Sequence, residues 1–473
     1  MAETIAENRT ARIVACCRDN GRSAIEFIKR YPFSIVSVAV AFFIALLSFD
    51  YIDCISVTTW TLSVWDALFD GRLLEYSEVT FENMRGAPHG GDTGGFLMSL
   101  PWAIWNFPLW ITHLTPGNYS IDNPACIIWS KLFLILCLFL ASYYVKKLSF
   151  MVTDDRTVSE YGFILCLTAG TAIISVGYAG QNEVIYVTSF LASVYYHIEG
   201  RKILSLCLMV YSLGCFPLLV IPLLMILLIR NVGVVKSILI AGVELLAAMF
   251  LFGIGGSSSS VDSYGSLVEY IDWFFYRTYI ISAEGTISFF MVSVVLLLLY
   301  CIFKKKEDVM HASIICLALF FTSMLIFSWM HFYRYYICLP AMILSLMLLY
   351  RTDRNLFNIG LIVFTIINFA SCIVACQDVN CWNYRYFQGL LSDFFSINCP
   401  NNFFWALFGD NTLKIGNLIL SGMVAVCLFY SYILIKRPTG FVEVKVKEKA
   451  FVFINAMCPL FLIMIYFIVP VIV

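Results

Sequence analysis

Two aspartates that lie close together in the sequence are the first residues that could carry out chemistry. Asp50 and Asp53 follow the apolar segment 32–49, and their spacing of three places both on one face if the helix continues. A carboxylate at the water edge of a helix can stay ionised in a partly desolvated cleft and accept a proton from an attacking hydroxyl. The same two residues can also simply end a helix in water, so spacing alone leaves both interpretations open.

A second group of polar residues lies late in the chain, at a short junction between two apolar segments. Arg334 is preceded by His331 and Tyr333. A guanidinium can bind a phosphate through two parallel hydrogen bonds, and a histidine can add a further donor. Arginine and tyrosine are also common anchors at a membrane surface. The junction therefore predicts either an anion site or an interfacial anchor.

Two further segments carry polar side chains that could contact a ligand. Gln181, Asn182 and Glu183 form a polar turn between two apolar segments, and His89 and Asp92 lie in a segment rich in glycine and proline. Glycine lets the backbone approach a ligand closely. A tight turn and a flexible connection explain the same residues equally well. One histidine and one aspartate do not make a metal site, so no ligand cluster indicates a cofactor, although a divalent metal stays possible.

The composition determines what kind of structure must position these residues. The 473-residue chain is 61% hydrophobic and 13% charged, whereas soluble proteins carry about 25% charged residues. Apolar runs of about 17 to 25 residues, each able to cross a bilayer, recur along the chain. The sequence thus predicts an all-α polytopic membrane protein with about 11–13 transmembrane helices, formed by one integral membrane domain over residues 1–473. The net charge of −1 argues against a nucleic-acid partner.

Basic residues predict the orientation of this domain. Six of them precede residue 31, so the positive-inside rule makes 1–31 a cytoplasmic segment. Later basic clusters then fall inside as well, and the opposite side receives the first external loop, 50–123, and a late external loop, 375–413. The predicted spans are 32–49, 124–145, 160–179, 183–198, a broken pair across 203–229, 237–254, 284–303, 311–330, 335–350, 356–374, 414–435 and 450–471.

One apolar segment of the first external loop, 95–113, does not fit a simple count of spans. Treating it as a span would reverse the side of every later loop and break the charge pattern. Its tryptophans, Trp102, Trp105 and Trp110, are typical of a helix at a membrane surface. We therefore expect an interfacial or re-entrant helix there, with a simple span as the alternative.

The seventeen cysteines do not predict a metal site, because no CxxC pair occurs and most of them lie inside apolar runs. Cys376, Cys381 and Cys399 share the late external loop. These three residues could form one disulfide and one free thiol, or no disulfide.

The layout resembles the GT-C superfamily of integral membrane glycosyltransferases, which take sugars from polyprenyl-phosphate donors. The resemblance rests on acidic residues at the first external loop, the polar turn, a broken hairpin and a late external junction. It covers most of the chain loosely, and none of its motifs is strict. The elements that carry it are Asp50, Asp53, the stretch from Trp65 through Gly71 to Tyr76, Gly180 to Glu183, Phe216-Pro217 with Pro222, and His331 to Pro340.

The resemblance implies an inverting sugar transfer at the non-cytoplasmic face, to a glycan or lipid-linked acceptor. It assigns the catalytic base to Asp50 or Asp53 and the donor phosphate to Arg334, His331 and Tyr333. Asp53 lies nearer the Trp- and Gly-containing run, and Asp50 lies nearer the membrane, so the choice between them stays open. The substrate contacts expected from the polar turn and the first loop are His89, Asp92, Gln181, Asn182 and Glu183.

Other functions also fit a multi-pass membrane protein. An O-antigen-type polymerase or ligase would use the same donors, but it is expected to carry several arginines in the late loop, where only Arg385 occurs. A transporter or flippase of a lipid-linked or polar solute would need polar residues within the spans. A purely structural membrane protein is a third alternative. Scarce external glycosylation sites, with Asn118-Tyr119-Ser120 as one, favour a bacterial plasma membrane. The sugar, the acceptor and the oligomeric state do not follow from the sequence.

Overall fold

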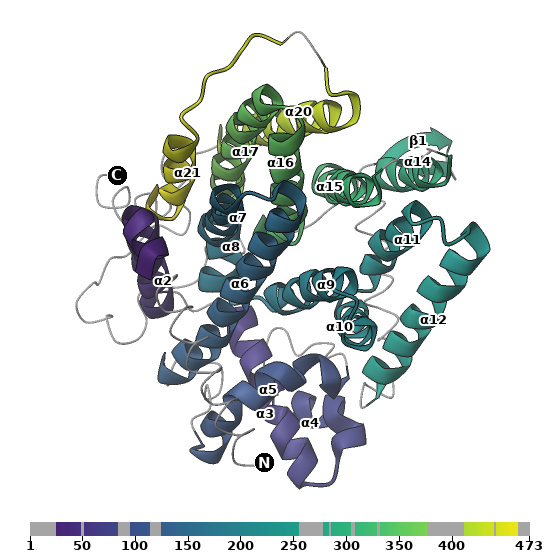
Figure 1. The fold of residues 1–473 in the computed structure, drawn as a ribbon. Helices are drawn as coiled ribbons and strands as arrows, with labels where there is room; N and C mark the ends of the chain where they lie inside the picture. The colour runs from purple at the N-terminus through teal and green to yellow at the C-terminus, as the bar shows by residue number, and fades with distance from the viewer. Residues whose placement is uncertain are drawn as a thin grey trace, which may run out of the picture.

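The computed structural model describes a mostly helical chain (Figure 1). The described residues are 25–48, 52–83, 95–113, 124–254, 278–282, 285–303, 308–328, 332–375, 411–438 and 441–461. Their elements are α2 (Pro32–Ser48), α3 (Ile52–Phe69), η1 (Leu73–Glu75), α4 (Tyr76–Asn83), α5 (Phe96–Ile111), α6 (Pro124–Thr153), α7 (Arg156–Thr168), α8 (Gly170–Ala172), η2 (Ile173–Tyr178), α9 (Glu183–Ile198), α10 (Lys202–Cys215), η3 (Pro217–Leu219), α11 (Val220–Ile229), α12 (Val234–Gly253), β1 (Thr278–Ser282), β2 (Gly285–Ser288), α14 (Phe289–Phe303), α15 (Val309–Phe327), η4 (Phe332–Cys338), α16 (Leu339–Thr352), α17 (Arg354–Ala375), α20 (Thr412–Lys436) and α21 (Glu448–Ala456).

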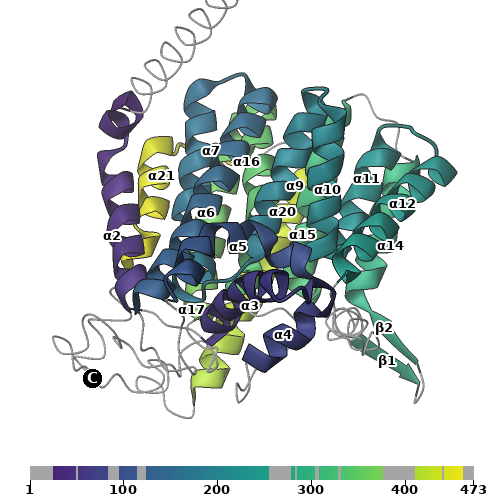
Figure 2. The same ribbon diagram turned by 90° about the horizontal axis from the view of Figure 1, so that it is seen from below.

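Most of these helices run side by side in one bundle (Figure 2). By length and apolar composition, six helices of the described chain can cross a bilayer, or seven if the bent pair α7 with α8 and η2 counts as one. These findings confirm a mostly helical chain and are compatible with a multi-pass membrane protein, while the expectation of about 11–13 spans stays a prediction. The long spans are Ala125–Thr153, Val234–Gly253, Val309–Phe327, Arg334–Thr352, Arg354–Ile373 and Lys414–Lys436.

The bent pair contains a break that the sequence did not reveal. The expected span 160–179 is a helix that ends at Thr168 and resumes at Gly170 after a bend of 45°. The freed Gly170 N–H donates to Asn368 Oδ1 at 2.9 Å. A side chain at position 170 would collide with Cys372 Sγ, which lies 1.8 Å from the position of a Cβ atom. Glycine therefore allows the close approach of α17 at the break.

The predicted broken pair across 203–229 is confirmed as two short helices, α10 and α11, joined by η3. The break lies at Phe216 and Pro217, where Phe216 adopts φ −144° and ψ 85°. Proline has no N–H to continue the hydrogen-bond ladder of a helix, and it restricts the preceding residue to extended conformations.

A second layer of helices lies across one end of the bundle. Figure 2 shows α3, α4 and α5 there, at an angle to the long helices. Segment 95–113 forms the helix α5, which is 16 residues long with Pro101 and Pro108 inside it. The segment therefore does form a separate helix, and the structure places it beside α3 rather than along the bundle axis.

One expected span begins differently from the prediction. Residues 285–288 of the predicted span 284–303 form β2, which pairs antiparallel with β1, and the helix begins only at Phe289. Thr278, Tyr279, Ile280 and Ile287 are the β-branched and aromatic residues that favour a strand. The all-α prediction thus holds apart from this hairpin in the described chain.

Basic residues gather at the end of the bundle opposite α3 to α5. Arg351 Nη1 donates to Val152 O at 3.0 Å, which brings the α16–α17 connection against the α6–α7 connection. Tyr350 Oη donates to Asp155 Oδ2 at 3.0 Å in the same place. Two of the connections that the sequence assigned to one side, α6–α7 and α16–α17, therefore meet at one end, which we call the basic end.

Candidate functional site

The described chain brings two of the predicted polar groups together. Glu183 is the first residue of α9, and Arg334 lies in η4; their Oε1 and Nε atoms are 3.2 Å apart. The side chain of Glu183 is 4% exposed and that of Arg334 is 24% exposed. The polar turn and the late junction, which are about 150 residues apart, thus meet in an ion pair between a buried glutamate and a half-buried arginine, at the end opposite the basic end.

The turn before Glu183 packs on the start of α3. Gly180 adopts a φ of +63°, and a Cβ atom there would lie 2.6 Å from Cys54 Sγ. Glycine is therefore required by both the backbone conformation and the space. Asp53 precedes Cys54 in the first turn of α3, so the backbone of a predicted catalytic residue lies beside the turn.

The other residues of the turn are also enclosed. Gln181 is 4% exposed, and its backbone N–H donates to Ser175 O at 2.9 Å. Asn182 is half-buried at the N-cap of α9. Acidic Glu183 in the first turn of that helix lies where the helix dipole favours a negative charge. The turn is thus a fixed structural element rather than a loose connection.

Several predicted site residues lie outside the described residues: Asp50, His89, Asp92 and His331. Tyr333 lies in η4, beside Arg334, and its backbone position alone is described. The assignment of a base, of substrate contacts and of further phosphate ligands to these residues stays a prediction.

Lys131 is a candidate residue that the sequence pattern did not single out. It lies in α6, is fully buried, and its Nζ donates to Gly177 O at 2.9 Å and to Tyr178 O at 3.3 Å. Both carbonyls belong to η2, a π-helical turn directly before the polar turn. A lysine inside a predicted span was a signal, because ionisable residues within membrane segments are costly and often functional.

Helices α3 and α5 are attached to α6 one residue before Lys131. The Ser130 hydroxyl accepts from Thr58 Oγ1 at 2.9 Å and from Asn106 Nδ2 at 3.1 Å, while Ser130 O accepts from Trp102 Nε1 at 3.1 Å. These buried bonds lock the layer onto the bundle, because an unpaired polar group there would cost about 1–3 kcal/mol. These bonds therefore connect α3 and α5 to α6 next to Lys131.

The outer part of this layer is built on Asp66. Its Oδ1 accepts from Trp110 Nε1 at 2.7 Å and its Oδ2 from Asn83 Nδ2 at 2.9 Å, which joins α3, α4 and α5. Tyr76 Oη contacts Trp60 O and Ser99 Oγ, both at 3.0 Å, and burial raises the pKa of Tyr76 to about 12. Tyr76 therefore stays a neutral hydrogen-bond donor at ordinary pH.

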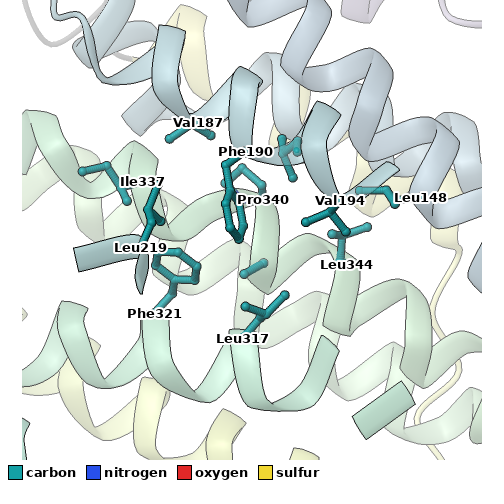
Figure 3. A pocket seen from close by; sticks show the side chains of 12 residues that line it. Leu148, Val187, Phe190, Val194, Leu219, Leu317, Phe321, Ile337, Pro340 and Leu344 are labelled. Carbon is teal, nitrogen blue, oxygen red and sulfur yellow. The ribbon is translucent and has the colours of Figure 1, made fainter. Parts of the chain in front are cut away.

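An apolar cavity lies inside the bundle, between α9 and α15 with α16 (Figure 3). Val187 and Ile337 line it, about one turn along the chain from Glu183 and Arg334. Its volume is about 30 Å³, and about 10–15 Å³ by this measure is enough to hold one water molecule. All of its lining side chains are apolar, so they offer no hydrogen bond to a polar ligand.

The described part of the chain contains no group of three or more metal-ligating side chains. Comparisons with protein-family models, with curated proteins and with solved structures found no match for the chain. The chemistry of this end of the bundle is therefore inferred from its geometry: a half-buried guanidinium paired with a buried carboxylate, and a turn before that carboxylate that contacts the start of α3 and follows the carbonyls bound by Lys131.

Proposed function

We propose that this protein is a membrane glycosyltransferase of GT-C type, which moves a sugar from a polyprenyl-phosphate donor to a glycan or lipid-linked acceptor. The observation that carries the proposal is the Arg334–Glu183 pair, in which Glu183 is buried and follows a turn that packs through Gly180 on the start of α3. Burial of a charged pair is costly, and in membrane segments such groups commonly mark substrate sites. The pair lies at the end of the bundle where a lipid-linked phosphate can arrive from the bilayer.

In the proposed reaction, the donor phosphate docks on the guanidinium of Arg334. Glu183 engages Nε, and the planar Nη groups match two phosphate oxygens. As the bond between the anomeric carbon and the phosphate oxygen breaks, that oxygen gains negative charge, which the guanidinium stabilises. The lipid phosphate leaves with the bonding electron pair.

The acceptor hydroxyl attacks the anomeric carbon from the face opposite the phosphate, which inverts the configuration. Its proton passes to the carboxylate of Asp50 or Asp53, the general base of the proposal. The position of Asp53 in the first turn of α3, which packs on the polar turn, supports a base close to the ion pair. His331 and Tyr333 are further proposed phosphate contacts, and His89, Asp92, Gln181 and Asn182 are proposed to contact the sugar or the acceptor.

The proposal includes the orientation in the membrane. The basic end faces the cytoplasm, the layer of α3 to α5 lies in the first external loop at the outer surface, and about 11–13 spans cross a bacterial plasma membrane. Cysteines introduced at Leu74 and Val442, which are 74% and 83% exposed, test the two sides. In a background without native cysteines, an impermeant maleimide should label Leu74→Cys from outside and Val442→Cys only after permeabilisation; labelling of both from outside would overturn this orientation.

A second candidate function is transport of a lipid-linked or polar solute. Lys131 favours it, because a fully buried ammonium inside α6 is the kind of group that lines a translocation path. Transport would move substrate without breaking a glycosidic bond. The same reconstituted protein can therefore distinguish the two functions.

The test is sugar transfer by the purified protein in lipid vesicles, with radiolabelled polyprenyl-phosphate sugars as donors and membrane extract as acceptor. Asp50→Asn and Asp53→Asn are compared with the wild type and with the matched control Asp155→Asn at the basic end. Loss of transfer in one of the first two folded variants would identify the base. If folded wild type transfers no sugar from any donor but moves the donor across the vesicle membrane, the transport function replaces the transferase.

A further inference from the structure

Two buried thiols meet near the C-terminal helix, away from the proposed site residues. Cys372 belongs to α17 and Cys458 follows α21, 86 residues later in the chain. Their Sγ atoms are 3.3 Å apart, and both side chains are fully buried. Most other cysteines of the described chain are small apolar side chains in the core, whereas these two thiols contact each other.

The surroundings hold the two thiols in register. Asn368, one helical turn before Cys372, donates from Nδ2 to Asn455 Oδ1 at 3.0 Å, and Asn455 Nδ2 donates to Thr365 Oγ1 at 2.8 Å. These amide bonds cross between α17 and α21 inside the bundle. Because both partners are buried, the bonds fix the relative position of the two helices.

The helix break closes the third side of the thiol pair. At Gly170 a Cβ atom would lie 1.8 Å from Cys372 Sγ and 3.0 Å from Cys458 Sγ. The absence of a side chain at position 170 is thus what gives both sulfurs their space. Gly170 is also bound to Asn368 through its N–H, so the thiols, the amides and the break form one packed cluster.

We propose that Cys372 and Cys458 are a latent disulfide site, which closes on oxidation and ties the C-terminal helix α21 to α17. The two thiols lose two protons and two electrons, and one sulfur–sulfur bond forms. A membrane-permeant two-electron oxidant, such as a quinone, takes up both and becomes a hydroquinone. Closure shortens the distance between the two sulfurs from 3.3 Å to about 2.05 Å. This oxidation does not depend on the glycosyltransferase proposal.

A disulfide here would constrain more of the chain than the other close thiol pair. Cys301 and Cys316 are 3.5 Å apart, but they belong to neighbouring helices only 15 residues apart in the chain. A cross-link that closes a longer loop restricts the unfolded chain more strongly. The Cys372–Cys458 bond would also fix the two cysteines against which Gly170, at the break between α7 and α8, is packed.

The test is oxidation of the purified full chain in lipid nanodiscs with copper phenanthroline and dioxygen, which is reduced to water. The protein is then denatured in excess maleimide, digested without reductant and analysed by mass spectrometry. The expected result is one linked peptide pair that contains Cys372 and Cys458, two hydrogens lighter than the sum of the reduced peptides, which separates on reduction.

Matched variants keep this test decisive. Cys301→Ala with Cys316→Ala removes the other close pair and should leave the Cys372–Cys458 link unchanged. Cys458→Ser should abolish it, whereas the variant still elutes as the wild type does on size exclusion. Recovery of Cys372 and Cys458 as maleimide adducts after oxidation of the folded wild type would overturn the proposal, as would a link from Cys372 to a different cysteine.

Discussion

Two of the arginine–glutamate pairs in the described chain, Arg334–Glu183 at one end of the bundle and Arg354–Glu448 at the basic end, differ in burial. Arg334 and Glu183 are 24% and 4% exposed, whereas Arg354 and Glu448 at the basic end are 56% and 24% exposed. Exposed pairs contribute about 0–1 kcal/mol to stability, but removal of one partner of a buried pair costs about 3–5 kcal/mol. Arg334–Glu183 is thus the more enclosed of these two pairs, although the basic end also contains an enclosed carboxylate, Glu160, which is 2% exposed and bound by Arg30.

The residues around the two pairs also differ. At the basic end Arg354 lies over the ring of Tyr350, 3.6 Å from its centroid. Arg30 Nη1 also forms an ion pair with Glu160 Oε2 at 2.7 Å. The attraction to Glu160 raises the pKa of Arg30. These contacts join helix ends that emerge there and need no ligand to explain them. At the opposite end the buried Lys131 donates to the carbonyls of Gly177 and Tyr178, just before the turn that leads to Glu183.

Replacement of each arginine by alanine should destabilise the protein much more at the Arg334–Glu183 pair than at the Arg354–Glu448 pair. Arg334→Ala leaves the carboxylate of Glu183 buried without its partner, and we expect the free energy of unfolding to fall by about 3 kcal/mol. Arg354→Ala should lower it by less than about 1 kcal/mol. Unfolding of both variants in mixed detergent and SDS micelles, followed by tryptophan fluorescence, measures the difference. Equal losses would remove the distinction between the ends.

A second variant tests Lys131 without touching the ion pair. Lys131→Met keeps the length of the side chain but leaves the carbonyls of Gly177 and Tyr178 without their donor, at a cost of about 1–3 kcal/mol. The matched control is Lys147→Met at the basic end of the same helix, which should change stability by less than about 0.5 kcal/mol. If Lys131→Met unfolds at the same SDS fraction as the wild type, Lys131 does not hold the turn.

The sequence predicted the residues of the ion pair but not that they meet. Glu183 and Arg334 were each assigned to a polar junction, because short polar runs between apolar segments are visible in one dimension. Their contact depends on how α9 packs on η4, which no local pattern encodes. Lys131 was missed because a single charge does not stop a long apolar run from being predicted as a span. Its partners are backbone carbonyls far along the chain, which no local pattern indicates.

Of the two helix breaks, only the one at a proline could be predicted from the sequence. Phe216-Pro217 was recognised because proline cannot continue a helix. The break at Gly170 carries no such residue, and it is stabilised by Asn368 from α17. The β-hairpin was likewise absorbed into a predicted span, since its strand residues are as apolar as the helix that follows them.

A smaller effect is expected from a helix cap at the basic end. Asp155 accepts from the N–H groups of Thr157 and Val158 at 2.8 and 3.1 Å, so Asp155→Ala should lower stability by about 1 kcal/mol. Sugar transfer should stay at the wild-type rate, because the cap lies at the far end of the bundle. A loss of transfer with stability preserved would show that the two ends are coupled.

The smallest effect concerns the apolar cavity inside the bundle. Ala341 lines it, and Ala341→Val adds two methyl groups to that space, which should raise the free energy of unfolding by up to about 1 kcal/mol. Leu418→Ile on the exposed face of α20 is a control that changes shape without filling a cavity. A decrease in stability for Ala341→Val would mean that the space is already closed in solution.

The most direct test of the central claim compares conservative changes in the two arginines. Transfer from radiolabelled polyprenyl-phosphate sugars is measured in vesicles with Arg334→Lys and with Arg354→Lys. If Arg334 holds the donor phosphate, its replacement by a point charge should lower the transfer rate by about 100-fold, while Arg354→Lys stays within about twofold of the wild type. Equal transfer by both folded variants would contradict the assignment of the working site to the Arg334–Glu183 pair.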